Sequence, residues 1–166
     1  MPSYFLDSSA IVKRYHRERG TQWIQTLAEA RTPQPLYISQ LAQVEVVAAL
    51  RRVGRNEGYH PSSVDALVNL FLRHLARSDA PSANPTYLIV PLSPTIMTLA
   101  SSLCSCYWDV APNPLRSLDA IQLACAIATA VDIPGEILFV TADTRLAAIV
   151  AFEGLRVINP SYPPQL

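Results

Sequence analysis

Short apolar runs alternate along the chain with longer segments in which apolar residues recur at helical spacing. The short runs predict strands, and the longer periodic segments predict helices. Because several runs end in Asp, Ser or Thr and lead into a helical pattern, the order indicates βα units, which build parallel sheets. Strands are expected at residues 4–6, 36–38, 87–90, 137–140 and 155–158. The predicted fold class is α/β, with a parallel sheet of about five strands flanked by helices.

Capping residues, prolines and glycines set the expected limits of the helices. A helix that opens after Asp7 is expected to run toward Gly20, and Ser39 is well placed to cap a helix over residues 40–52. Pro61 introduces an amphipathic helix, and Ser93 precedes a first-turn proline in the helix after it. Further helices are expected at residues 21–30, 94–108, 120–131 and 143–152, and irregular chain at 79–86 and 111–114.

The composition fits one domain over residues 1–166. Of these, 50% are hydrophobic and 16% are charged, which suffices for one core, and the chain is too short for two ordinary domains. Thirteen basic and thirteen acidic side chains give a formal net charge of zero, so any surface for nucleic acid must be local. No secretion leader is visible, and residues 120–131, the most apolar segment, fall short of the ~20 residues that span a bilayer. With three cysteines that cannot all pair, these features predict a cytoplasmic protein without membrane contact.

Three aspartates, Asp7, Asp119 and Asp143, stand at or near the start of expected helices. An aspartate in that position can simply cap the helix, which stabilises it by about 1 kcal/mol without any further function. In a parallel sheet, however, residues just past the carboxyl ends of the strands meet at one edge. Asp7 and Asp143 are therefore expected to lie together, within reach of the neighbouring helices.

Glu45 is different, because it is expected in the middle of its helix, where it cannot cap anything. Its helical neighbours Leu41, Ala48 and Ala49 are apolar, so the carboxylate is expected to be half-buried and to need a partner. Arg116 is one candidate, in a buried ion pair. The other candidate is a hard divalent cation shared with the aspartates, since Mg²⁺ and Mn²⁺ prefer carboxylate and water oxygens.

Four segments around these acids resemble the four motifs of PIN domains, particularly of VapC-type toxins from toxin-antitoxin pairs. They are YFLDSSAIVKRY from residue 4, ISQLAQVEVVAALRR from residue 38, LRSLDAIQLA from residue 115 and FVTADTRL from residue 139. Their order and spacing agree with the family over nearly the whole chain. Two positions depart from it: Ser8 stands where threonine is usual, and Gln122 where many relatives have histidine.

The resemblance implies that Asp7, Glu45, Asp119 and Asp143 form an acidic quartet that is both catalytic and metal-binding. It also implies supporting roles for three nearby hydroxyl side chains, those of Ser8, Ser9 and Thr141. The family further implies a five-stranded parallel sheet, Mg²⁺ or Mn²⁺ as cofactor and single-stranded or looped RNA as substrate. Homodimers are frequent in it, and an antitoxin protein occludes the site.

The expected reaction is metal-dependent hydrolysis of RNA phosphodiester bonds, with Asp7 and Asp119 as the first choice of ligands. Basic side chains near the acids can hold the RNA backbone, although ordinary solvated helix faces explain them equally well. They are Lys13, Arg14 and Arg17 near Asp7, Arg51 and Arg52 near Glu45, and Arg116 near Asp119.

Two other interpretations are open. An aspartate after the first strand is also where phosphoaspartyl phosphatases place their nucleophile, but those enzymes need a second acid where Ser9 stands here. The chain can alternatively be a PIN-like module that keeps its acids yet binds RNA or a protein partner without cleavage.

Overall fold

A central parallel sheet organises the part of the chain that the computed structural model describes, residues 2–30, 34–76, 86–110 and 114–164. The sheet has five strands in the order β3-β2-β1-β4-β5, and every pairing is parallel. The strands are β1 (Ser3–Leu6), β2 (Leu36–Ser39), β3 (Leu88–Val90), β4 (Ile137–Val140) and β5 (Arg156–Ile158). The predicted α/β class with a parallel sheet of about five strands is confirmed.

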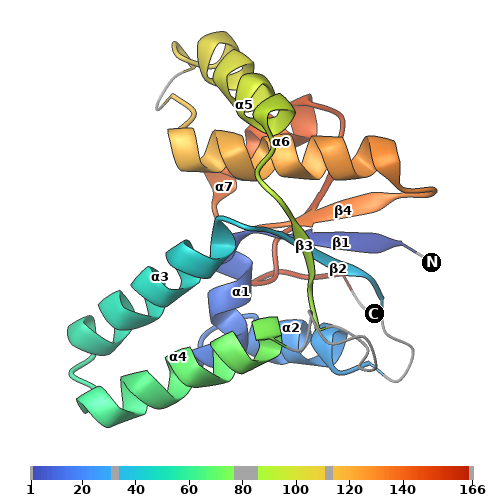
Figure 1. Ribbon diagram of the computed structural model, residues 1–166. Helices are drawn as coiled ribbons and strands as arrows, with labels where there is room; N and C mark the ends of the chain where they lie inside the picture. Colours follow the sequence, from blue (N-terminus) through green and yellow to red (C-terminus); the bar gives the residue numbers. More distant parts are fainter. Residues whose placement is uncertain (1, 31–33, 77–85, 111–113, 165–166) are drawn as a thin grey trace.

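Helices cover both faces of this sheet (Figure 1). On one face are α1 (Ser8–Tyr15), α2 (Thr21–Ala28), α3 (Ala42–Asn56) and α4 (Pro61–Ala76). On the other face are α5 (Pro94–Cys106), α6 (Ser117–Asp132) and α7 (Thr144–Phe152). No helix among the described residues combines the length and the apolar character needed to cross a bilayer.

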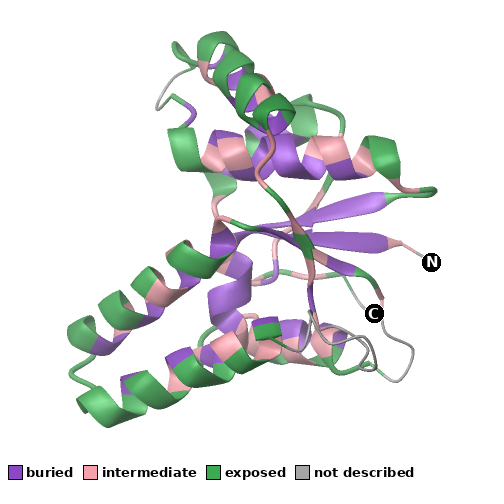
Figure 2. Cartoon of the chain, viewed as in Figure 1, coloured by how far each residue is buried: buried purple, intermediate pink, exposed green. Residues whose placement is uncertain are grey.

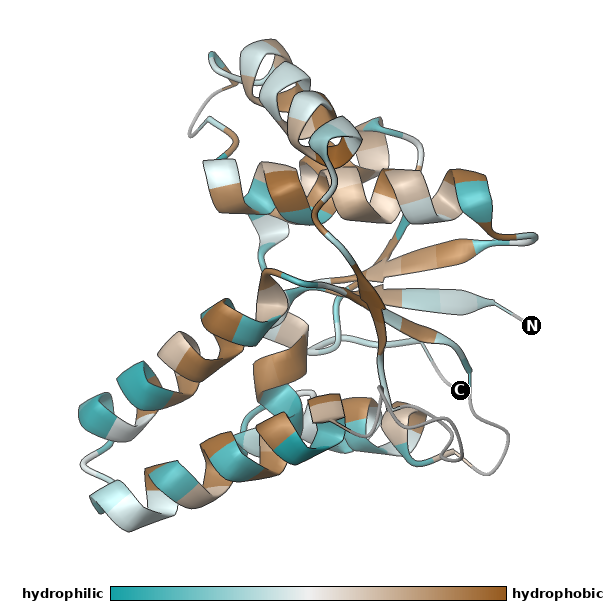
Figure 3. Ribbon diagram, in the orientation of Figure 1, coloured by the Kyte–Doolittle hydropathy of each residue, from teal (hydrophilic) through white to brown (hydrophobic). Residues whose placement is uncertain are grey.

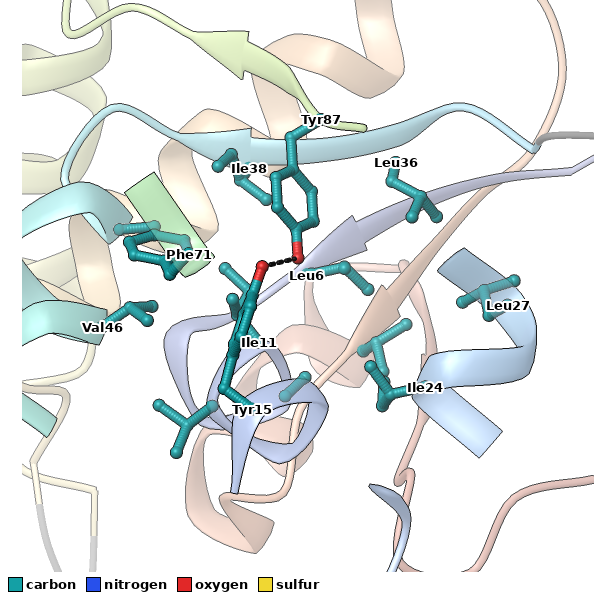
Figure 4. Close-up of a cluster of buried hydrophobic side chains, with 14 of the residues drawn as sticks. Leu6, Ile11, Tyr15, Ile24, Leu27, Leu36, Ile38, Val46, Phe71 and Tyr87 are labelled. Atoms are coloured by element: carbon teal, nitrogen blue, oxygen red, sulfur yellow. Dashed lines mark hydrogen bonds between the residues drawn. The ribbon is translucent and has the colours of Figure 1, made fainter. Parts of the chain in front are cut away.

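Alternating side chains of the strands build two hydrophobic cores. In β1, Leu6 joins the core with α1 to α4, whereas Phe5 faces α5 to α7 and stacks on Phe139 of β4 with a centroid distance of 5.5 Å. Strands β1 and β4 are buried along their whole length (Figure 2), and strand β4 is also strongly hydrophobic (Figure 3). Figure 4 shows the first core, where the buried hydroxyls of Tyr15 and Tyr87 lie 3.0 Å apart in a hydrogen bond. Such two-sided burial is typical of the middle strands of a parallel sheet.

Two helix limits differ from the prediction. Helix α1 ends at Tyr15 instead of running on toward Gly20, which has a φ of 98° and directly precedes α2. Ser39 does not cap α3, because it pairs with Val90 as the last residue of β2, and the Gln40 N–H still donates to the Val90 carbonyl at 2.9 Å. The chain therefore stays extended longer than expected, and α3 begins at Ala42.

The other limits agree with the prediction within a few residues. The Ser93 Oγ accepts a hydrogen bond from the Ile96 N–H at 3.2 Å and caps α5. Asp143 occupies the cap of α7, and α6 begins at Ser117. The irregular segments expected at 79–86 and 111–114 lie almost entirely outside the described residues.

Helices α3 and α4 form a hairpin that extends away from the sheet (Figure 1). They approach each other closely at Gly54 of α3, where an added Cβ would lie 2.2 Å from Cγ2 of Val64. A side chain at position 54 would therefore require Val64 or one of the two helices to shift.

Candidate active site

The four predicted acids line one cleft of about 480 Å³ at the carboxyl edge of the sheet. Asp7 directly follows β1 and Asp143 follows β4, and these strands are neighbours, with the Asp7 N–H donating to the Val140 carbonyl at 3.0 Å. Glu45 enters from α3 and Asp119 from α6. Strands β2 and β3 extend the sheet on one side of β1, whereas β4 and β5 extend it on the other side. Ligand sites of open α/β sheets lie where the order of strands changes side in this way.

Asp7 is the most deeply buried of the four, with 6% of its surface exposed. Its Oδ2 accepts hydrogen bonds from Ser9 Oγ at 2.7 Å and from Thr141 Oγ1 at 2.8 Å. Burial raises the pKa of Asp7, and these hydrogen bonds partly oppose the rise. Asp7 stands at the cap position of α1 without a side-chain cap bond, so helix capping does not account for it.

The same two hydroxyls also join the ends of two elements. Ser9 Oγ accepts from the Ala142 N–H at 3.0 Å, and Thr141 Oγ1 accepts from the Asp143 N–H at 3.0 Å. Ser9 and Thr141 therefore fix the start of α1 against the end of β4 while they hold the Asp7 carboxylate.

Glu45 lies in the first turn of α3 and not in the middle of the helix, because α3 begins later than predicted. Its Oε2 accepts from Ser8 Oγ at 2.6 Å and from Gln122 Nε2 at 2.5 Å. Burial raises the pKa of Glu45, the two hydrogen bonds lower it, and the nearby Asp7 raises it further. Within the described chain Arg116 forms no ion pair with Glu45, so that alternative partner is wrong.

Gln122 is the first functional candidate whose role the sequence prediction missed. The side chain is fully buried on α6, one turn after Asp119. Its Nε2 donates to Ser8 Oγ at 2.8 Å as well as to Glu45, so a chain of donors links α6, α1 and α3. A single amide in the apolar stretch AIQLA was a signal, because a buried polar side chain needs a partner.

Asp119 lies in the first turn of α6, where the cap residue is Arg116. Its carboxylate accepts no hydrogen bond from the residues that the structure describes. Burial, then the charges of Asp7 and Asp143, raise its pKa to about 6, while Arg116 lowers it and Glu45 adds to the rise. Within the described part of the chain, Asp119 is therefore an acid without a direct partner, next to other acids.

Asp143 differs from the other three. Its Oδ1 accepts from the backbone N–H groups of Arg145 at 2.8 Å and Leu146 at 3.2 Å, so the cap interpretation holds for this residue. Its Oδ2 lies 3.2 Å from Nη2 of Arg145 in an ion pair. Partial burial alone would raise the pKa of Asp143, but the Arg145 side chain and the two backbone donors outweigh it and lower the pKa.

Three of the six predicted RNA-binding side chains line the acidic cleft: Lys13, Arg52 and Arg116. Arg52 and Arg116 are exposed, whereas Lys13 is buried with 4% exposure. The Lys13 ammonium is 2.9 Å from Glu18, which also lines the cleft, and it donates to the Arg19 carbonyl. Lys13 thus lines the cleft as a buried, ion-paired side chain and does not belong to a solvated helix face.

The other three lie outside the cleft. Arg14 donates to the Tyr87 hydroxyl at 3.1 Å and packs over the Tyr87 ring, and exposed Arg17 lines a separate hollow beside α2. Arg51 forms an exposed ion pair with Asp65 of α4 at 2.6 Å. The structure therefore concentrates the available positive charge near the acids on Arg52, Arg116 and the unpredicted Arg145.

The donor set of the cleft fits a hard divalent cation, because carboxylate and hydroxyl oxygens face it and neither sulfur nor imidazole lines it. Among the described residues, no three acid, histidine or cysteine side chains stand together as a ready group of ligands. The carboxylates are held in part by their own partners, namely hydroxyls for Asp7, Ser8 and Gln122 for Glu45, and Arg145 for Asp143.

Comparison with known proteins agrees with this geometry. The family model of the PIN domain matches residues 4–151, and the chain belongs to the PIN domain family. No curated protein sequence matches the chain. Its fold is similar to that of a chain in the crystal structure of VapBC2 from Rickettsia felis bound to a DNA fragment from their promoter. That similarity has a TM-score of 0.60 at 14% identity, over 94% of this chain and 97% of the other.

Proposed function

We propose that this chain is a Mg²⁺- or Mn²⁺-dependent endoribonuclease, the VapC-type toxin of a toxin-antitoxin pair. The observation that carries the proposal is the convergence of four carboxylates from four elements in one cleft, where burial and mutual repulsion raise the pKa of Asp119 to about 6. Membership of the PIN domain family, whose members are generally nucleases, supports it.

In the proposed site, Asp7 and Asp119 bind the metal ion directly. Three roles are open to Glu45 and Asp143: direct ligand, ligand through a water molecule, or general base. A bound Mg²⁺ or Mn²⁺ supplies charge neutralisation of the phosphate and an oriented water for in-line attack. Ser9 and Thr141 hold the Asp7 carboxylate, while Ser8 and Gln122 hold Glu45. This fixed geometry lowers the reorganisation needed when substrate arrives.

The proposed substrate is RNA, with its backbone contacting Arg52 and Arg116 at the cleft. One solved structure with a similar fold is a VapBC2 complex, which supports a cognate antitoxin as the protein partner here. We further propose that the whole chain, residues 1–166, works as one nuclease unit in the cytoplasm and forms homodimers.

A non-catalytic PIN-like module that binds RNA or a protein is the alternative, since fold and acids alone do not distinguish binding from cleavage. A phosphoaspartyl phosphatase is disfavoured, because Asp7 Oδ2 is engaged by two hydroxyls and Ser9 replaces the second acid.

The deciding experiment compares RNA cleavage by wild type, Asp7→Asn and Asp65→Asn. Asp65 is the matched control, an exposed aspartate on α4 outside the cleft. We expect Mg²⁺ or Mn²⁺ but not Zn²⁺ to support cleavage, chelator to abolish it, and Asp7→Asn to reduce it on the order of a thousandfold or more. Asp65→Asn should match wild type.

Cleavage that persists in excess chelator, or in Asp7→Asn, would contradict the proposed chemistry. RNA binding without any cleavage by wild type would favour the binding module. Covalent trapping of Asp7 by a phosphate analogue would instead favour the phosphatase.

A further inference from the structure

The two oxygens of Asp143 have different partners. Oδ1 is fixed by two backbone N–H groups at the start of α7, with the Arg145 Nε at 3.4 Å as a weak third donor. Among the described residues, Oδ2 is held only by Nη2 of Arg145 at 3.2 Å. The cap alone therefore keeps the carboxylate in place, and the Arg145 side chain can leave Oδ2 without moving Asp143.

Arg145 also belongs to a second feature, a small recess beside the acidic cleft. Arg145 and Arg116 line this recess together with Asp119, and Arg116 and Asp119 line the main cleft as well. Two arginines, one at the cap of α6 and one in the first turn of α7, thus line the same recess as the acid that the cleft and the recess share, and the charge of each acts on that acid. A pair of arginines in this arrangement is suited to the charge and shape of a phosphodiester.

We propose that Arg145 alternates between two anions: it is the counter-ion of Asp143 in the RNA-free protein and a phosphate ligand, with Arg116, when RNA is bound. This inference rests on the proposed function. Departure of Arg145 exposes Oδ2 of Asp143 to the cleft, so arrival of the RNA backbone and completion of the metal site become linked events. In the RNA-free protein, Arg145 competes with the divalent cation for Asp143.

The exchange is feasible because the existing ion pair is weak. The Arg145 side chain is 41% exposed and that of Asp143 is 25% exposed, and exposed pairs contribute little to stability because water screens them. When a guanidinium binds a phosphate through two parallel hydrogen bonds, the two charges neutralise each other and the orientation of the phosphate is fixed. The Arg145 side chain can therefore move from Asp143 to the incoming phosphate with little loss of folding stability.

The test is Arg145→Ala, measured by two binding assays that need no catalysis. Mn²⁺ titration of the RNA-free protein by calorimetry should give an affinity about threefold to tenfold tighter than wild type, since a competing positive charge is gone. Anisotropy of a short labelled single-stranded RNA in chelator should give an affinity about fivefold weaker, with the dependence of log affinity on log salt reduced by about 0.7. Opposite signs in the two assays are the signature of the exchange.

Arg156→Ala is the matched control, because Arg156 forms an exposed ion pair with Glu136 at 2.8 Å outside the cleft and the recess. It should leave both affinities unchanged. Arg145→Lys keeps the charge without the planar fork, so it should retain wild-type Mn²⁺ affinity while binding RNA more weakly. Thermal melts in chelator within about 2 °C of wild type would establish that the variants are folded.

Unchanged or weaker Mn²⁺ binding by Arg145→Ala, or unchanged RNA binding, overturns the exchange. If wild type and Arg156→Ala both bind neither Mn²⁺ nor RNA, the proposed function fails and the exchange fails with it. If wild type cleaves RNA but the two affinities shift in the same direction, only the exchange fails.

Discussion

The two halves of the acidic cleft hold their carboxylates in different ways. In the inner half, Asp7 and Glu45 receive hydrogen bonds from neutral hydroxyl and amide donors. In the outer half, Asp143 has a guanidinium partner and Asp119 has no direct partner among the described residues. Neutral donors fix a carboxylate without supplying a compensating charge, whereas an arginine supplies one. In the inner half the two carboxylates therefore have no arginine partner that a cation must displace, and in the outer half the Arg145 partner of Asp143 is the charge that can be exchanged.

Gln122→Met tests the inner half through a residue that holds a carboxylate without being one of the acids, and its expected effect on the rate is larger in free energy than the stability effects predicted below. Methionine fills a similar volume but cannot donate to Glu45, so we expect kcat for RNA cleavage to fall about 10- to 100-fold with little change in KM. Stability in chelator should change little, because the loss of the two hydrogen bonds that Nε2 donates is offset by removal of Oε1, which is buried and unpaired within the described chain. Steady-state kinetics and thermal melts measure the two effects separately.

The companion variant Gln122→His restores an N–H donor and should recover most of the lost kcat. Wild-type kcat in Gln122→Met would show that Ser8 alone orients Glu45. A fall in stability that parallels the fall in activity would show that Gln122 acts through packing instead.

Asp119→Asn should have an intermediate effect, measured as a change in stability, and tests the unpaired acid of the outer half. The folded-state pKa of Asp119 is about 6 against an ordinary value of 3.8, so ionisation opposes folding, and wild type loses stability as the pH rises through that interval. In chelator at neutral pH we expect Asp119→Asn to be more stable by about 1 kcal/mol, after allowance for solvent screening. The difference should disappear below the ordinary pKa.

Thermal melts across this pH range, with metal removed, check the sign. A lower midpoint for Asp119→Asn at neutral pH would mean that the charge of Arg116 outweighs the repulsion from the other acids. Loss of Mn²⁺ binding in the same variant is expected as well.

Asp143→Asn should have the smallest effect on stability, with the opposite sign. Asparagine still caps α7, but the ion pair with Arg145 is lost, so we expect a loss of at most about 0.5 kcal/mol at neutral pH. The folded-state pKa of Asp143 is lowered, so its ionised form favours folding, and the difference from wild type should vanish as the pH falls through that pKa. If Asp143→Asn instead gained as much stability as Asp119→Asn, the two outer acids would not differ in whether their charge has a favourable partner.

Much of the fold was predictable because the strands alternate between two buried faces and end at residues that open helices. The same logic placed Asp7 and Asp143 at one edge. The limits of α3 were not predictable, since Ser39 has the chemistry of a cap and stays in β2 only because β3 pairs with it. That long-range pairing moved Glu45 into the first turn.

Two basic residues illustrate what sequence patterns leave open: Arg145, which was not predicted, and Lys13, whose surroundings were not. Arg145 stands two positions after Asp143, and nothing local decides whether its side chain turns back to the carboxylate or out to water. From the sequence, Lys13 resembles a solvated helix residue. In the structure, the chain beyond the end of α1 folds back, so that Lys13 pairs with Glu18 and donates to the Arg19 carbonyl. Both cases depend on the path of the chain outside the helix, which periodicity does not encode.

The contact of Gly54 with Val64 links the packing of α3 against α4 to the position of Glu45, because both Gly54 and Glu45 belong to α3. Gly54 and Glu45 lie nine positions apart on one helix, which is about 14 Å at the rise of an α-helix. Because a rigid helix tilts as a unit, a small wedge at Gly54 would swing the first turn of α3 and displace the carboxylate from Ser8 and Gln122. The close approach of α3 and α4 at Gly54, far from the sheet, thus helps to set the position of Glu45 in the acidic cleft.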